Sequence, residues 1–62
     1  MFKYLSILRP VDIGTYPKRG FKGFKNYDTR IEVKGIMAWG ELYYDRELSD
    51  KELSDYELAK LV

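Results

Sequence analysis

The stretch TRIEVKGIMAWGELYY, residues 29–44, decides the fold of this chain. Its first half alternates apolar and polar residues, so Ile31 and Val33 are expected to face the core while the residues between them face water. Gly35 then favours a tight turn, because glycine accepts positive φ at little cost. The pattern predicts a β-hairpin. Its two strands are expected at about 28–34 and 36–44.

The second strand of this hairpin holds the residues expected to pack most tightly. Trp39 lies between two small residues and is expected to anchor the core of so small a sheet. Gly40 indicates a bulge or a close approach of a neighbouring backbone, since a glycine inside a strand otherwise weakens it. Tyr43 and Tyr44 are adjacent, so one should face the core and the other the solvent. Both are candidate interface residues, and the outward one is the candidate of choice.

The N-terminal segment predicts one more strand and a long loop. Residues 2–8 are rich in aromatic and aliphatic side chains, and Pro10 stops whatever they form, so a strand is expected there. From residue 9 to residue 27 no apolar period appears, while prolines and glycines recur. We therefore expect a loop over 9–27. Loops longer than about 12–15 residues in compact domains are usually functional or disordered.

The C-terminal segment predicts a helix. Ser49 and Glu52 form a capping box, in which each side chain satisfies a backbone N–H of the first turn. A helix is expected over about 50–61, although its apolar residues are spread over two sides instead of one. Acidic residues gather in its first turns, which suits the positive end of the helix dipole. Together the elements predict one α+β domain, residues 1–62, with a three-stranded antiparallel sheet and one helix.

Size and composition exclude several kinds of chemistry. A chain of 62 residues buries only about 60% of the surface that its unfolded form exposes, so its core must be thin. There is no cysteine and no histidine, which excludes disulfides, thiolate chemistry and zinc sites built from these residues. Aromatic packing is expected to stabilise the core instead. No nucleophile lies beside an activating base, so we expect a non-enzymatic protein without metal or cofactor.

Charge is distributed unevenly along the chain, although the net charge is only +1. Residues 1–34 hold eight cations and three anions, whereas residues 35–62 hold three cations and seven anions. This asymmetry could steer an anionic partner to one face of the molecule. Pairing of the two halves across the fold explains it equally well. Both explanations stay open from the sequence.

Residues 19–27, RGFKGFKNY, interleave cations, glycines and aromatic rings. Cations neutralise phosphate, rings stack on unpaired bases, and glycine lets a ligand approach the backbone. The stretch partly matches an RNA-binding consensus, but Lys22 interrupts the match and the stretch falls in the expected loop. The rings could instead cap the thin core, and the cations could simply be solvated. The candidate nucleic-acid-binding residues are Lys18, Arg19, Phe21, Lys22, Phe24, Lys25, Tyr27 and Arg30.

Distinct short motifs are spread along most of the chain. They are Arg9-Pro10, Ile13-Gly14-Thr15-Tyr16-Pro17, Asn26-Tyr27-Asp28-Thr29-Arg30, Ala38-Trp39-Gly40, Tyr44-Asp45-Arg46, Lys51-Glu52-Leu53 and Asp55-Tyr56-Glu57-Leu58. In these motifs the chain resembles a family of short uncharacterised proteins of gut Firmicutes and their mobile elements. The resemblance implies a bacterial accessory protein. It assigns no chemistry to any residue, so it leaves nucleic-acid handling and interference with a host protein both open.

Three functions are compatible with these observations. The first is a small binding module that contacts nucleic acid through the basic aromatic stretch. The alternative is a protein-interaction or inhibitor module of a mobile element, which docks its acidic helix and hairpin edge on a larger protein. A homo-oligomer that pairs its free strand edge is the third. The N-terminal apolar run is too short for a signal peptide or a membrane span, so we expect a cytoplasmic protein without membrane contact.

Overall fold

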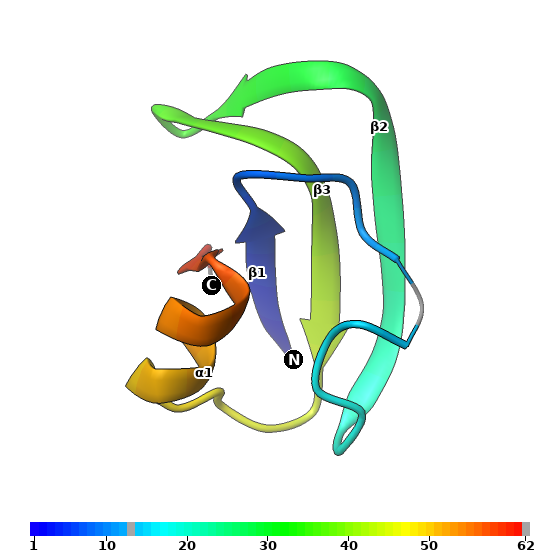
Figure 1. The fold of residues 1–62 in the computed structure, drawn as a ribbon, viewed down its shortest axis with the longest axis vertical. Helices are drawn as coiled ribbons and strands as arrows, with labels where there is room; N and C mark the ends of the chain where they lie inside the picture. Colours follow the sequence, from blue (N-terminus) through cyan, green and yellow to red (C-terminus); the bar gives the residue numbers. More distant parts are fainter. Residues whose placement is uncertain (13, 62) are drawn as a thin grey trace.

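The elements follow one another as β1 (Phe2–Ser6), β2 (Phe21–Val33), β3 (Ile36–Tyr44), α1 (Asp50–Tyr56) and β4 (Leu58–Lys60). The computed structural model describes residues 1–12 and 14–61, so Ile13, which belongs to one of the quoted motifs, lies outside the described residues. The strands form one antiparallel sheet in the order β2-β3-β1-β4 (Figure 1). The α+β class is confirmed, but the sheet has four strands instead of the expected three.

The β-hairpin between β2 and β3 is confirmed. Lys34 and Gly35 at its turn both have positive φ, 51° and 83°. Two consecutive positive φ values are typical of the two-residue turn whose twist matches that of its strands. Further from the turn the pairing is interrupted, because residues 27–30 of β2 lie opposite Trp39 alone. β2 bends over in this region, near the top of Figure 1.

The expected loop over 9–27 is wrong in its second part, because β2 already begins at Phe21. Gly20 takes a positive φ of 79°, and its carbonyl accepts a hydrogen bond from the Asp45 N–H at 2.9 Å, which ends the loop there. Gly23, one of the glycines that suggested a loop, lies within this strand and pairs with Tyr43. At the other end, β1 stops at Ser6 and not at residue 8.

The expected helix over 50–61 is also too long. Ser49 and Glu52 form the expected capping box, but α1 ends at Tyr56 because Glu57 adopts left-handed backbone with φ 56°. The Glu57 N–H then bonds to carbonyls of the last turn, as in other helix ends of this kind. The chain reverses and β4 pairs antiparallel with β1. In the described part of the chain no helix is long and apolar enough to span a membrane.

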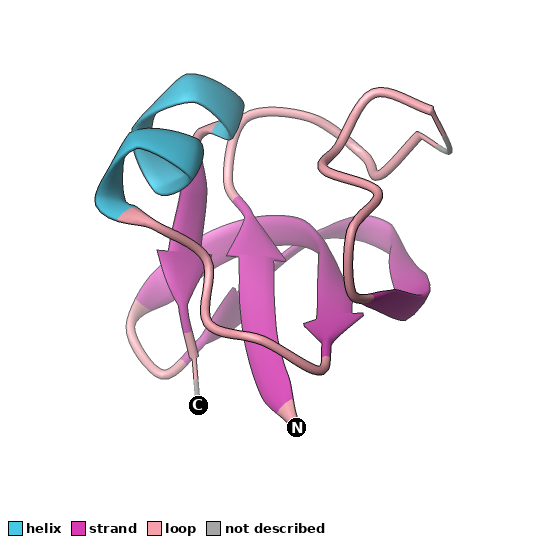
Figure 2. Ribbon diagram, turned by 90° about the horizontal axis from the view of Figure 1, so that it is seen from below, coloured by secondary structure: helices cyan, strands magenta, loops and turns pink. Residues whose placement is uncertain are grey.

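The core lies on one face of the sheet. Tyr4, Leu42 and Tyr44 are fully buried there, and their rings and side chains pack against residues of the β1–β2 segment and of the α1 region. The residues added from outside the sheet are Val11, Tyr16, Leu48, Leu53 and Tyr56. Figure 2 shows the helix and the β1–β2 segment on the same side of the sheet. Tyrosine rings, set edge to face at 5.9 Å in the Tyr4–Tyr44 pair, supply much of this core.

Three residues expected in this core lie outside it. Ile31 is 39% exposed and Val33 is half-buried, because the end of the hairpin extends past the segments that cover the sheet. Trp39 is also only half-buried. Its side chain belongs to the opposite face, since Trp39 alternates with the buried Ala38 and with Gly40. The core position expected for Trp39 is taken by tyrosines.

The β1–β2 segment, residues 7–20, is hydrogen-bonded to the sheet beside Gly40. A Cβ at this residue would lie 2.7 Å from both the Lys25 carbonyl oxygen and the Asn26 Oδ1, so the expected close approach is confirmed. The Asn26 side chain passes over Gly40 and bonds both ways with Val11. It accepts from the Val11 N–H at 2.7 Å and donates to the Val11 carbonyl at 3.0 Å. The Asn26 side chain thus satisfies both backbone groups of Val11, as the backbone of a neighbouring strand would.

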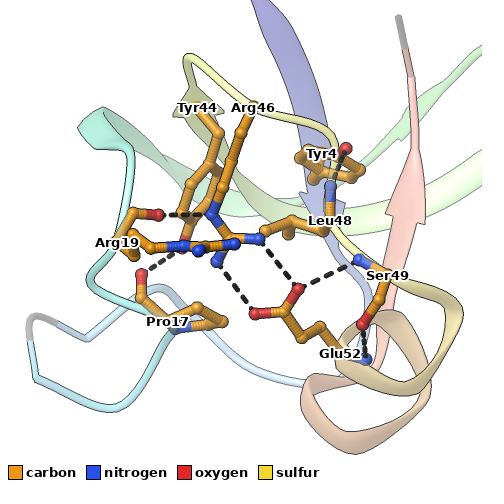
Figure 3. A network of polar contacts seen from close by, with 8 residues as sticks. All are labelled: Tyr4, Pro17, Arg19, Tyr44, Arg46, Leu48, Ser49 and Glu52. Carbon is orange, nitrogen blue, oxygen red and sulfur yellow. Dashed lines mark hydrogen bonds and ion pairs between the residues drawn. The ribbon is translucent and has the colours of Figure 1, made fainter.

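A polar network joins the end of β3 to the segment before β2 and to α1 (Figure 3). Arg46 donates through Nε to the Arg19 carbonyl at 2.8 Å, and through its two terminal nitrogens to the Glu52 carboxylate at 3.0 and 2.9 Å. The Tyr44 hydroxyl donates to the Pro17 carbonyl at 2.7 Å. A two-pronged arginine–carboxylate contact fixes direction as well as distance. The network therefore holds α1 against the sheet end.

Glu52 predicts how stability depends on acid. Hydrogen bonds from Arg46 and from the Ser49 backbone lower the pKa of Glu52 from 4.5 to about 2. Because the folded pKa lies below the unfolded one, this contribution to stability is complete above about pH 4.5 and is lost as the pH falls toward 2. We expect the urea concentration at the midpoint of unfolding to decrease as the pH is lowered from about 4.5 toward 2. The decrease should be smaller in Glu52→Gln. Asp50→Asn, in the same helical turn, is the control and should retain the wild-type decrease.

Candidate nucleic-acid interface

The alternation of β2 divides the basic aromatic stretch between the two faces of the sheet. Phe21 and Phe24 point to the core side, where their rings stack at 6.4 Å and Phe21 meets Tyr44 at 5.5 Å. The bulge at Lys22 puts both phenylalanines on the same side despite their spacing of three. Lys25 and Tyr27 therefore point to the other face. For Phe21 the alternative role as a cap on the core is confirmed.

The other face carries a cluster of cations, rings and one carboxylate. Register places its members side by side, because Lys3 pairs with Tyr43, while Lys25 pairs with Glu41. Both lysines are exposed, and the remaining members are partly exposed. We call this group the open-face cluster. It consists of Lys3, Lys25, Tyr27, Trp39, Glu41 and Tyr43.

The carboxylate of Glu41 is the centre of the open-face cluster. The hydroxyls of Tyr27 and Tyr43 donate to its two oxygens, one to each. Burial alone would raise the pKa of Glu41, but these two hydrogen bonds and the charges of Lys3 and Lys25 together lower it. Glu41 is therefore ionised at neutral pH.

The two tyrosines of the cluster are held in their protonated form. Burial, followed by the hydrogen bond to Glu41, raises the pKa of Tyr27 to about 12. For Tyr43 the hydrogen bond to Glu41 is the larger cause and burial the second, and its pKa also rises to about 12. Lys3 lies 5.8 Å from the centre of the Tyr43 ring, a cation–π contact. The rings of Tyr27 and Tyr43 are thus oriented by their hydrogen bonds to Glu41.

The remaining candidate residues are not brought together at this cluster. Lys22 forms an ion pair with Asp45 at 3.3 Å, and Arg19 contributes its carbonyl to the Arg46 network. Arg30 lies in the part of β2 that is unpaired with β3. Lys18 borders a small apolar pocket of about 180 Å³ on the core side of the molecule. The described lining residues of this pocket are Val11, Asp12, Gly14, Tyr16, Pro17, Lys18 and Phe21.

The adjacent tyrosines of β3 face opposite sides, as expected. Tyr44 is fully buried in the core, so it is not available as an interface ring, whereas Tyr43 is the outward one. Lys3, Trp39 and Glu41 were not expected at a site. The alternation of β1 and β3 places them on one face, but only the register of three strands brings them beside Lys25. Among residues 1–12 and 14–61, no three acidic side chains gather as a metal site would require.

Comparison with known proteins identifies the family of this chain. Its full length, residues 1–62, matches the family model described as "Defence against restriction A C-terminal". This family comprises small proteins associated with phages and mobile elements, so that part of the resemblance is confirmed, whereas the match shows no link to gut Firmicutes. No curated protein and no solved structure matches the chain. The protein therefore belongs to the Defence against restriction A C-terminal family.

Proposed function

We propose that this protein is a non-enzymatic module that binds nucleic acid through the open-face cluster, in the service of protecting mobile DNA from restriction. The observation that carries the proposal is the position of two exposed lysines and three partly exposed rings on one sheet face. Lysines there can contact phosphates and rings can contact bases. The family description supplies the biological setting.

The charge pairs of the structure favour this function over an acidic inhibitor. Five of the seven anions of residues 35–62 form ion pairs with cations of the chain. The pairs are Arg9–Glu57, Lys22–Asp45, Arg46–Glu52, Lys51–Asp55 and Lys60–Glu47. An acidic surface that imitated DNA would need these carboxylates unpaired. Within α1, Glu52 and Asp55 are paired and Asp50 has no ion pair among the described residues, so the helix offers little of the free negative charge that docking on a nucleic-acid groove requires.

The cations of the N-terminal half are paired less completely. Of the eight cations in residues 1–34, Arg9 and Lys22 form ion pairs, so six have no carboxylate of the described residues within 4.0 Å. The six are Lys3, Lys18, Arg19, Lys25, Arg30 and Lys34. Two of them, Lys3 and Lys25, belong to the open-face cluster. These two can release counterions on binding a polyanion.

A titration with short DNA and RNA, followed by backbone amide shifts at two salt concentrations, tests the proposal. We expect shifts on residues 3, 25–27 and 39–43 that weaken as salt rises. If the two lysines each contact one phosphate of a single strand, the slope of log K against log salt should be about −1.4. Lys3→Glu and Lys25→Glu should each reduce affinity and make that slope shallower by about 0.7.

The matched control is Lys51→Glu, which makes the same change of charge on α1. That helix packs on the core side, away from the open-face cluster. The affinity of Lys51→Glu for the oligomers should stay within about twofold of that of the wild type. Equal losses in all three variants would indicate a general charge effect and would contradict a site at the cluster. Absence of any shift at low salt would rule out nucleic acid and would leave a protein partner as the alternative.

A further inference from the structure

We infer that the ligand of the open-face cluster is single-stranded nucleic acid, with unpaired bases over the rings and phosphates at the lysines on either side of Glu41. This inference rests on the proposed function and names its substrate class. It follows from the shape of the face, from the fixed negative charge at its centre, and from the position of the two lysines.

The shape of the face does not fit a duplex groove. Proteins that read duplex DNA insert a helix or a two-stranded ribbon into a groove. α1 has only seven residues, packs on the core side and carries acidic residues in its first turn. The end of the β2–β3 hairpin is the available ribbon, but its cations Arg30 and Lys34 alternate with the anions Asp28 and Glu32. A sheet face with rings on it suits unstacked bases instead.

Glu41 determines which part of the ligand lies at the centre. Its carboxylate is ionised, lies beside Lys25 across the sheet, and lies diagonal to Lys3, which pairs with Tyr43. A phosphate at this point would be repelled, so phosphates must lie toward the lysines. Lys3 is on β1 and Lys25 on β2, so the strands that carry them are about 10 Å apart, and the two lysines are offset by two residues along the sheet.

The side chains at the centre of the cluster can bind a nucleic-acid base. Tyr27 and Tyr43 each give one hydrogen bond to Glu41, and each carboxylate oxygen retains a further acceptor position. The amino group of a base can donate to such a position. Trp39 lies two residues before Glu41 on the same face and is only partly buried, so part of its ring is open to stacking. A neutral, flat, hydrogen-bonding group is therefore the complement of this centre.

Trp39 is the only tryptophan of the chain, so its fluorescence reports on this site alone. The probes are a single-stranded DNA oligomer of about ten nucleotides, the same oligomer with abasic sugars, and its duplex. We expect the intact single strand to quench Trp39 and to bind at least about tenfold more tightly than either of the others, because base stacking supplies that difference. The abasic strand retains every phosphate and should bind with little quenching.

Glu41→Gln provides a second readout that does not depend on removing a ring. The amide has the size of the carboxylate and can still accept a tyrosine hydrogen bond, so the fold should be retained. Loss of the negative charge should increase affinity for the abasic strand several-fold. The ratio of the affinities for the intact and the abasic strand should therefore decrease.

The outcomes distinguish this inference from the proposed function. Equal, salt-sensitive binding of single strand, abasic strand and duplex would overturn the inference and leave a phosphate-binding surface. Unchanged affinity of Glu41→Gln for the abasic strand would also overturn it, since Glu41 would then not act on phosphates. Binding of none of the three probes would overturn both the inference and the proposed function.

Discussion

Gly40→Ala should destabilise the protein by about 3 kcal/mol, the upper part of the range for overpacked interiors. The added methyl group would lie 2.7 Å from the Lys25 carbonyl oxygen, which belongs to the backbone of the paired strand and cannot move without breaking the β2–β3 ladder. It would also displace the Asn26 side chain from its two bonds with Val11. A domain of this size has only about 3–5 kcal/mol to lose. Urea unfolding followed by circular dichroism measures the change.

Gly23→Ala is the matched control for this substitution. Gly23 lies on the strand paired with β3, but its added methyl group would meet only the Tyr43 ring at 3.6 Å, an ordinary contact. We expect its stability to change by less than about 1 kcal/mol, because a compatible glycine-to-alanine change also lowers the entropy of the unfolded chain. Equal effects at the two glycines would contradict the close approach at Gly40.

A second background separates the two contacts at Gly40. Asn26→Ala removes the side-chain clash but leaves the Lys25 carbonyl in place. Gly40→Ala should therefore still be destabilising in this background, although by less than in the wild type. If the two substitutions simply add, the side chain of Asn26 contributes nothing to the clash.

The elements that the sequence predicts correctly are those fixed by neighbouring residues. The hairpin turn depends on Lys34 and Gly35 taking positive φ, and the helix start depends on Ser49 and Glu52 three residues apart. Both signals act within one turn of chain. They are therefore visible without any knowledge of the fold.

The elements that were missed depend on partners far away in the chain. β4 has three residues and exists because β1, more than fifty positions earlier, has a free edge for it. Its sequence, Leu-Ala-Lys, would extend a helix equally well. The early part of β2 was missed for a similar reason, because Gly23 is stabilised in a strand by pairing with β3. Tertiary pairing outweighs local preference in both places.

The candidate site was predicted in part. Lys25 and Tyr27 lie on the open face, but the neighbouring phenylalanines were assigned to the same surface because a loop has no alternation to separate them. Once residues 21–33 are a strand with a bulge at Lys22, the division between the faces follows. Lys3 and Glu41 could be assigned only after the order β2-β3-β1 was known.

The open-face cluster also covers a second, smaller core. Leu5 pairs with Glu41 and Ala59, so its side chain lies on the face opposite Leu42, yet both leucines are fully buried. Leu5 does not belong to the main core. By register its neighbours on that face are the side chains of the cluster and of β4. The cluster therefore has a structural role in addition to any ligand.

Leu5→Ala should lower the free energy of unfolding by about 2–5 kcal/mol, because loss of the side chain leaves a cavity beneath the cluster. This is the same decrease as for a leucine-to-alanine change in a core that helices cover. Met37→Ala is the control, since Met37 lies on the same face but is 41% exposed, and it should change stability by less than about 0.5 kcal/mol. Thermal unfolding, with Trp39 fluorescence as a second probe, measures both. A small effect at Leu5 would mean that the cluster shields it without packing against it. The open face would then be free to rearrange around a ligand, and its rings would not be the ordered surface that stacking on bases requires.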